Sequence, residues 1–254
     1  MKKGLWLAVG LVLLATAASA LEFGAQGFYW YPELSGDLRV DAGGVVGTRF
    51  DLEEDMDVDK EGFIGVKLFA GLGSHHLSVE AMRVTYKGTY TQNEEIIFGG
   101  IVIPITADGD FELDYAMVDA IYRWDLIDLE NVLAGFSLGP ILSGKLLQGT
   151  AELTATHPLA SEHQKEEFNA IIPMVGAGAH VGILADLLEA NLEVRGIGYN
   201  GNKVIDARAE IAYTPFPFLD VGVGYRVIQL DVDYDDVSLD LSQAGPWAGL
   251  TLGF

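Results

Sequence analysis

The sequence predicts an all-β fold, an antiparallel up-and-down transmembrane β-barrel of about ten strands, with about eight as the alternative. Three observations predict it. Apolar and polar residues alternate along several segments, as in residues 220–227, which is typical of strands whose two faces meet different surroundings. The chain begins with a segment that resembles an export signal. Long polar connections alternate with short ones, as in barrels that cross a membrane.

Residues 1–20 have the organisation of a secretory signal peptide. Lys2 and Lys3 precede an apolar stretch over residues 5–15, and the small residues 18–20 match a cleavage site. We expect cleavage after Ala20, which leaves residues 21–254 as one barrel domain. The chain has no cysteine, so an exported domain needs a stabilising device other than disulfides. A closed, hydrogen-bonded barrel is such a device.

The alternating segments are long enough to cross a membrane as tilted strands. The expected strands are Glu22–Tyr31, Phe63–Leu72, His76–Lys87, Phe111–Trp124, Asn131–Leu146, Phe168–Leu184, Glu189–Tyr199, Val204–Tyr213, Leu219–Val232 and a last strand ending at Phe254. The strongest candidate for a transmembrane helix, residues 168–185, contains Pro173 and also alternates, which favours a strand. Arg83 falls on an apolar face, which predicts either a bulge or a position near lipid headgroups.

The connections indicate which end of each strand lies outside. Long polar segments are expected at 32–61, 88–110 and 147–167, and short turns between the other strands place both termini on the periplasmic side. Aromatic residues near strand ends predict two interfacial girdles. The girdle on the turn side comprises Tyr122, Trp124, Tyr213, Phe216, Phe218 and Phe254. The girdle on the loop side comprises Tyr29, Tyr31, Tyr86, Tyr90 and Tyr199.

These features, together with the closing Leu250-x-Leu252-x-Phe254, resemble Gram-negative outer-membrane β-barrel proteins, with the small OmpA-like and OmpW-like barrels nearest in style. The resemblance covers the chain after residue 20 and implies a monomer in the cell outer membrane, in contact with outer-membrane lipid and lipopolysaccharide. It also implies that the barrel-assembly machinery reads Phe254 as an assembly signal. Omptin proteases have ten strands as well, but their acidic pair and Asp–His pair have no match in the sequence.

Charged residues of both signs fall on the face opposite the apolar one. The predicted lumenal charge network is Lys67, Glu80, Asp119, Arg123, Lys145, Glu193, Arg195, Asp206, Arg208, Glu210 and Arg226, with Glu189 and Asp220 on the same face. A barrel of about ten strands is narrow, and buried charges are costly unless they are paired. We therefore expect a salt-bridged plug, with a narrow ion or solute path as the functional alternative.

The formal net charge of −22 disfavours nucleic acid as a partner, because phosphates require a basic surface. The densest acidic run suggests loose cation binding by Asp55, Asp57 and Asp59. The twelfth position of the calcium-loop pattern that starts at Asp57 is Leu68, which cannot supply the closing carboxylate. No metal site or cofactor is predicted beyond this weak hypothesis.

Residues 135–139 match the G-x-S-x-G pattern of a nucleophile elbow, but no helix is expected after Ser137, so the match is interpreted as coincidence. The five histidines do not form a metal set. The sequence thus predicts an outer-membrane barrel, not an enzyme, with a structural, adhesive or weakly permeating role. One alternative is an outer-membrane enzyme acting on lipopolysaccharide or protein at the outer rim. A soluble periplasmic barrel is another, and predicts extraction without detergent.

Overall fold

The computed structural model describes residues 21–41, 44, 46–53, 57–58, 60–91, 96–98, 101–103, 108–129, 135–157, 160–183, 187–199, 201–234 and 237–254. Within these ranges the regular elements are strands. No helix in this part of the chain is long and apolar enough to cross a membrane.

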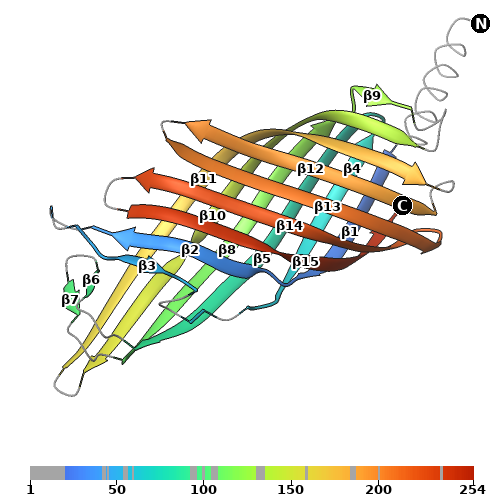
Figure 1. The fold of residues 1–254 in the computed structure, drawn as a ribbon. Helices are drawn as coiled ribbons and strands as arrows, with labels where there is room; N and C mark the ends of the chain where they lie inside the picture. Colours follow the sequence, from blue (N-terminus) through green and yellow to red (C-terminus); the bar gives the residue numbers. More distant parts are fainter. Residues whose placement is uncertain are drawn as a thin grey trace, which may run out of the picture.

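Ten long strands form the wall of a closed antiparallel barrel (Figure 1). They are β1 (Leu21–Trp30), β4 (Phe63–Leu72), β5 (His75–Thr91), β8 (Asp108–Trp124), β10 (Phe136–His157), β11 (Ala160–Ile183), β12 (Leu188–Tyr199), β13 (Asn202–Phe216), β14 (Leu219–Tyr234) and β15 (Val237–Gly253). Each wall strand pairs with the next one along the chain, and β1 pairs with β15 from Gly24↔Gly253 to Trp30↔Trp247. This confirms the ten-stranded prediction. The alternative of eight is wrong, because β12 and β13 are separate wall strands.

Several wall strands continue far beyond the predicted ends. The pairing of β10 with β11 runs from Phe136↔Val181 to His157↔Ala160, so the segment 147–167, predicted as a long loop, is mostly a paired hairpin. The prediction was wrong there because the segment is polar on its outward face. Leu21, the first described residue, and Phe254 lie at the opposite end of the barrel, where the backbone of Phe254 is hydrogen-bonded to that of Phe23. We call this the turn end, and the other the hairpin end.

Short strands add to the hairpin end, within segments that were predicted as polar connections (Figure 1). They are β2 (Glu33–Val40), β3 (Arg49–Asp51), β6 (Ile96–Phe98) and β7 (Ile101–Ile103). Another short strand, β9 (Ile127–Asp128), lies at the turn end instead. The chain continues from β1 through Tyr31 and Pro32 into β2, which pairs with the first half of β15. Strand β3 then pairs with β2.

A band of exposed apolar side chains surrounds the turn-end half of the wall. Its most exposed members include Ile64, Leu68, Leu77, Leu142, Ile171, Val175, Val223 and Leu250, each more than half exposed. The outward faces of all ten strands contribute to it, and no second sheet packs against them in the described part of the chain. Such a band is the surface that a transmembrane barrel presents to hydrocarbon. A soluble sandwich would bury these side chains between two sheets. In this structure they are exposed instead.

The polarity of the two faces reverses within single strands. Along β5 the outward residues change from apolar to polar in the order Leu77, Val79, Ala81, Arg83, Thr85, Lys87. The inward residues change in the opposite sense in the order Ser78, Glu80, Met82, Val84, Tyr86. The same reversal occurs on β8, β10, β11 and β14. A strand in hydrocarbon carries apolar side chains on its outward face, whereas a strand in water carries polar ones there. The reversal therefore marks the edge of the apolar band that lies nearest the hairpin end.

Arg83 lies at this edge without a bulge in the register of β5. Its guanidinium makes two hydrogen bonds to the carboxylate of Asp114 on the outward face of β8, one of them 2.9 Å long. The arginine is mostly exposed. The register therefore excludes the bulge, and the position near the lipid headgroups stays a prediction.

Inside the hairpin-end half, the lumen is filled by a hydrophobic core. Its fully buried members come from opposite sides of the barrel: Trp30, Leu34, Leu52, Val84, Tyr86 and Ile228. Tyr86 stacks edge-on against Phe63. This side chain was predicted to belong to the loop-side girdle, which is wrong, because it occupies an inward position on β5. The core resembles that of a soluble β-protein, with polar residues outside.

The other predicted girdle residues mostly point outward. On the turn side Trp124, Tyr213, Phe216, Phe218 and Phe254 are exposed, and Tyr122 stacks on His75. On the loop side Tyr29, Tyr31 and Tyr199 are exposed, and the side chain of Tyr90 lies outside the described residues. Amphipathic rings at the two edges of the apolar band are typical of membrane interfaces.

Candidate functional site: the charged lumen

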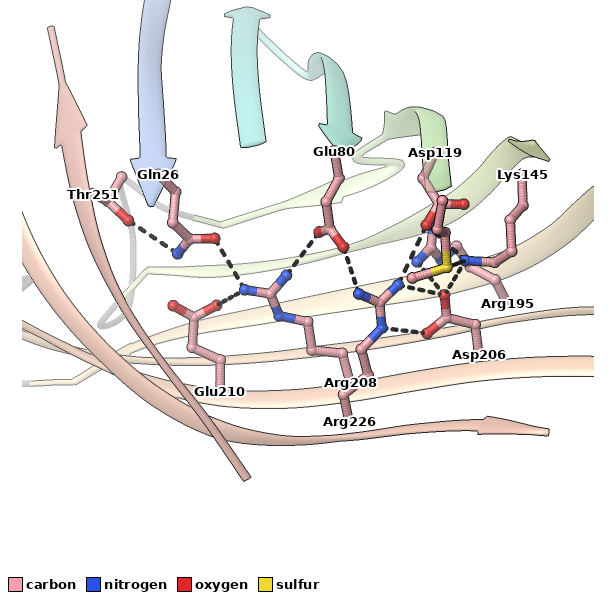
Figure 2. A network of polar contacts seen from close by, with 11 residues as sticks. Gln26, Glu80, Asp119, Lys145, Arg195, Asp206, Arg208, Glu210, Arg226 and Thr251 are labelled. Carbon is pink, nitrogen blue, oxygen red and sulfur yellow. Dashed lines mark hydrogen bonds and ion pairs between the residues drawn. The ribbon is translucent and has the colours of Figure 1, made fainter. Parts of the chain in front are cut away.

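A layer of charged side chains crosses the lumen below the hydrophobic core. Figure 2 shows its members pointing toward one another from different strands: Gln26, Glu80, Asp119, Lys145, Arg195, Asp206, Arg208, Glu210, Arg226 and Thr251. The layer forms because charged residues recur at inward positions of β5, β8, β10, β12, β13 and β14 at one height. Most of the charged members are at least nine-tenths buried. The structure thus brings together most of the residues that the alternation placed on the inward face.

Arg226 is the central cation. Its Nε and Nη2 donate to the two carboxylate oxygens of Asp206 at 3.1 and 2.8 Å, which is a bidentate pair. Its Nη1 donates to Glu80, and its Nη2 also lies 3.3 Å from Asp119 Oδ2. Since β14 carries Arg226 while β5 and β8 carry Glu80 and Asp119, these bonds connect opposite walls of the barrel. The planar guanidinium suits this use because it presents several donors in fixed directions.

Asp206 is the central anion. Its Oδ2 accepts hydrogen bonds from Lys145 Nζ at 3.0 Å and from Arg195 Nη2 at 2.8 Å, in addition to the bonds from Arg226. Lys145 Nζ also donates to Asp119 Oδ2 at 2.7 Å. Lys145, Asp119 and Asp206 have no exposed side-chain surface. Buried ions are tolerated when paired and hydrogen-bonded in this way, whereas removing one partner leaves an uncompensated charge.

Arg208 extends the layer toward β1 and β15. Its Nη1 donates to Glu80 Oε2 at 3.1 Å and its Nη2 to Gln26 Oε1 at 3.0 Å, with Glu210 at 3.7 Å. Gln26 in turn donates to Thr251. The guanidinium of Arg208 lies 3.8 Å from the centre of the Trp247 ring. This cation–π contact joins the charged layer to the aromatic side chains above it.

Arg123 was predicted to belong to the network, but it forms a separate cluster at the turn end. Its guanidinium donates to both carboxylate oxygens of Asp125 at 2.6 and 3.0 Å and to Ser137 Oγ at 2.6 Å. The imidazole of His76 lies 3.1 Å from Asp125. Alternation placed Arg123 on the correct face, but it gave no height along the barrel axis.

This cluster contains Ser137, His76 and Asp125, yet not in the order that nucleophilic catalysis requires. Ser137 is fully buried and contacts Arg123. The imidazole of His76 lies 3.1 Å from the carboxylate of Asp125, and within the described ranges Ser137 Oγ is bonded to Arg123. A nucleophile needs its hydroxyl exposed and bonded to the base. No helix follows Ser137, so the G-x-S-x-G match remains interpreted as coincidence.

Lys67 and Glu193 lie nearer the turn end than the paired core. Both line a cavity of about 220 Å³ below the charged layer, which also includes Glu189, Asn191 and Asp220. Neither has an ion-pair partner within bonding distance in the described ranges. The lumen therefore consists of a polar cavity at the turn end, a paired charged layer, and an apolar core at the hairpin end.

Sequence reasoning missed Gln26, Thr251 and Asp125. Gln26 and Thr251 are uncharged, so the search for charges on one face passed over them, although both occupy inward positions. Asp125 was assigned to a turn. In the weak cation hypothesis, Asp55 and Asp59 lie outside the described residues, and Asp57 is exposed with a positive φ of 43°. No group of three or more metal-ligating side chains occurs in the described ranges.

Phe254, the predicted assembly signal, is held on the outer surface at the turn end. Its ring stacks between those of Phe23 and Phe218, with centroid separations of 5.9 and 5.6 Å. Its backbone N–H donates to Phe23 at 2.8 Å, and Gly253 donates to Phe218 at 3.1 Å. Phe254 and Gly253 therefore bond the end of β15 to β1 and to the turn that precedes β14.

Phe254→Ala is expected to lower the yield of folded barrel in cells, because it removes this stack at the closing strand. The measurement is the fraction of protein that migrates as the compact form in unheated electrophoresis, compared with Phe216→Ala, an exposed aromatic residue on the same side of the barrel. Equal yields for the two variants would contradict a special role for the last residue.

Comparison with known proteins supports the fold. No family model matches the chain, and no curated protein matches it in sequence. Among solved structures, the outer membrane protease OmpT from Escherichia coli is similar with a TM-score of 0.57 and 10% identity, over 91% of this chain and 97% of that chain. The transport unit of the autotransporter AIDA-I from Escherichia coli has a TM-score of 0.40 at 10% identity, over 92% and 89%. Ail of Yersinia pestis has 0.33 at 12%, over 91% and 98%.

At this identity the likeness to OmpT shows the fold and nothing finer. The chain is a closed, ten-stranded, antiparallel barrel of the kind found in outer-membrane β-barrel proteins. The apolar band and the reversal of polarity above it are the features expected of such a barrel in a bilayer.

Proposed function

We propose that the protein is a sealed barrel of the outer membrane with a structural and adhesive role, displaying a paired β-sheet at the cell surface. In this proposal the turn end faces the periplasm, the hairpin end faces outward, and the protein is a monomer surrounded by lipid and lipopolysaccharide. The barrel-assembly machinery would recognise its last strand.

The observation that carries the proposal is the double blockage of the lumen. The charged layer connects opposite walls through Arg226, Glu80 and Asp119. Above it, the hydrophobic core includes Trp30 and Tyr86, both with no exposed surface. An aqueous path needs a continuous polar lining, and an apolar core in series with ion pairs does not supply one. The weakly permeating role therefore has less support than the structural one.

The adhesive part of the proposal rests on the outward face of the hairpin end. One row of side chains crosses four neighbouring strands, Lys87, Glu112, Glu152 and Lys165 in register order. Lys87 pairs with Glu112 at 3.1 Å, and Lys165 pairs with Glu152. A stiff sheet that carries polar side chains outside and an apolar core inside is suited to presenting a fixed surface to a partner.

Planar-bilayer recording tests the sealed lumen. The wild-type barrel is expected to give no unitary current steps. The variant Glu80→Ser with Arg226→Ser, which opens the charged layer, is also expected to give none, because the apolar core lies in series with that layer. Steps from the folded wild type would contradict the proposal.

Adherence of cells that express the protein tests the surface role. Replacing residues 150–167 by a short turn removes the outer part of the β10–β11 hairpin while leaving the apolar band in place. We expect the shortened protein to insert normally and the cells to adhere less to protein-coated surfaces. Unchanged adherence would contradict the adhesive role, and only the structural role would remain. A catalytic role at the outer rim has no supporting cluster in the described residues, since Ser137, His76 and Asp125 gather at the turn end.

A further inference from the structure

We propose that the outer half of β11 binds an extended polypeptide segment of another protein, which adds to the barrel as an extra strand. Strand β11 pairs with β10 from Ala160 to Val181, but its pairing with β12 ends at Val175↔Gly196. Among the described residues, no strand pairs with the other edge of residues 160–174. The inference rests on the proposed adhesive role of the hairpin end and names the class of partner.

The edge is open because β12 turns away from β11. Beyond Gly196, β12 continues to Tyr199, and in this part the described chain pairs it with β13 only. In Figure 1 the end of β12 lies at the upper left, whereas the start of β11 lies beside the end of β10 at the lower left. The two strands therefore form a notch whose closed end lies at Val175 and Gly196.

The register shows which residues of β11 turn their backbone toward the open edge. The N–H of Gly182 donates to the carbonyl oxygen of Gly135, so even-numbered residues of β11 bond to β10. The register then runs without a shift to His157↔Ala160. Bonding directions alternate along an antiparallel strand, so odd-numbered residues point away from β10. Pro173 is odd-numbered, which agrees, because a sheet tolerates proline where no N–H is needed.

The residues whose N–H and C=O groups face the open edge are Ser161, His163, Lys165, Glu167, Asn169 and Ile171. Another extended backbone matches such a row, because it offers a C=O for each N–H and an N–H for each C=O at the same spacing. The backbone groups of a helix are already bonded to one another. The occupant that suits this edge is therefore a strand.

The side chains beside the edge set the pattern of that strand. On the outward face Lys165 and Glu167 are exposed. On the inward face Phe168 and Ile172 pack against the hydrophobic core, yet Ala170 between them is exposed, so the core is open at this side. An added strand with alternating apolar residues would extend the core. In antiparallel register, a basic residue opposite Glu167 and an acidic residue opposite Lys165 would complement the edge.

A second copy of this chain fits the edge less well than a short segment of another protein. Antiparallel self-pairing that sets Lys165 opposite Glu167 also sets Ala160, at the hairpin tip of one copy, opposite Ile172 of the other. The neighbouring Ile171 belongs to the apolar band. The tip of each copy would then reach the hydrocarbon of the membrane that holds the other. A short segment has no such extension.

Binding of a synthetic peptide to the full barrel in phospholipid nanodiscs tests the inference. The probe has about eight residues, in which valines alternate with polar residues and lysine and glutamate are placed opposite Glu167 and Lys165. Fluorescence anisotropy of the labelled probe is expected to show saturable binding. Methylating the amide nitrogens that face β11 should weaken binding about tenfold, because it removes their hydrogen bonds. Methylating the intervening nitrogens should leave binding unchanged.

Variants of the barrel test the same contact from the protein side. Asn169→Pro removes an N–H that faces the edge and should weaken binding about tenfold, while the pairing with β10 persists. Glu167→Lys should weaken binding of the probe and restore it for a probe whose lysine is replaced by glutamate. Asp110→Lys makes the same change of charge on the exposed outward face of β8, two strands away, and should leave binding unchanged.

The inference is overturned by any of four results: no saturable binding to the wild type, equal effects of the two methylations, undiminished binding to Glu167→Lys, or a doubled mass from barrel pairing at this edge. If Asn169→Pro does not insert, the two probes with Glu167→Lys decide. Insertion is scored by the compact band in unheated electrophoresis, and a wild type that fails to insert contradicts the proposed function. Cells that adhere through a barrel that binds no peptide contradict only the role of this edge.

Discussion

Asp206→Ala is expected to lower the free energy of unfolding by about 3–5 kcal/mol, the usual cost of removing one partner from a buried ion pair. Asp206 accepts hydrogen bonds from Lys145, Arg195 and Arg226, so its loss leaves three buried cations with fewer counter-charges. The measurement is urea-dependent folding into phospholipid vesicles, followed by the compact band in unheated electrophoresis.

Two comparisons make the result specific to the lumen. Adding Lys145→Met to Asp206→Ala should restore part of the stability, because it removes one uncompensated charge. Glu112→Ala, which removes a solvent-exposed ion pair with Lys87, should change stability by less than about 1 kcal/mol. If Asp206→Ala cost no more than Glu112→Ala, the charged layer would not be holding the walls together.

Val223→Arg is expected to destabilise the inserted barrel by about 2–4 kcal/mol, the range for a basic residue on a lipid-facing wall at the bilayer midplane. Val223 is more than half exposed and points outward from β14 among other apolar residues. The same vesicle-folding measurement applies, with the slope of stability against urea used to check that the unfolded reference is unchanged.

Gln229→Arg is the matched control, on the same strand and the same face. Gln229 is in register with Ser242 and lies above the apolar band, where a basic residue costs about 0–1 kcal/mol. A similar cost at both positions would place position 223 outside the hydrocarbon. That outcome would contradict the height assigned to the band.

The wall of the barrel could be predicted from sequence because alternation is a local property. Each residue's neighbours fix its face, and the faces of β4, β12 and β14 are as predicted. The outer parts of the strands could not be predicted in the same way. In 147–167 the outward face turns polar, and a search for one apolar face reads this reversal as a loop. Tyr86 was misplaced for the same reason, since above the band an aromatic residue belongs inside.

The site was predicted as a set of residues but not as a structure. Alternation places Glu80 and Arg226 on the inward face, but it does not bring β5 opposite β14. That relation depends on barrel closure and on the stagger between strands, which are global properties. Arg123 illustrates the limit of this reasoning. Alternation predicted its inward face correctly, but its partner, Asp125, lies in a turn, where alternation predicts nothing. Uncharged members such as Gln26 cannot be found by a search for charged residues, and only their inward position in the strand indicates them.

The reversal of polarity along β8, β10 and β11 has a consequence for how the chain enters a membrane. The outward residues Glu112, Glu152 and Lys165 must pass through hydrocarbon before they reach the far side, and a lysine at the midplane alone costs about 2–4 kcal/mol. Until β1 pairs with β15 and closes the barrel, the inward apolar residues have no packing partners and remain in contact with water. Entry into plain lipid is thus opposed at both faces, so shortening the β10–β11 hairpin should accelerate unassisted insertion.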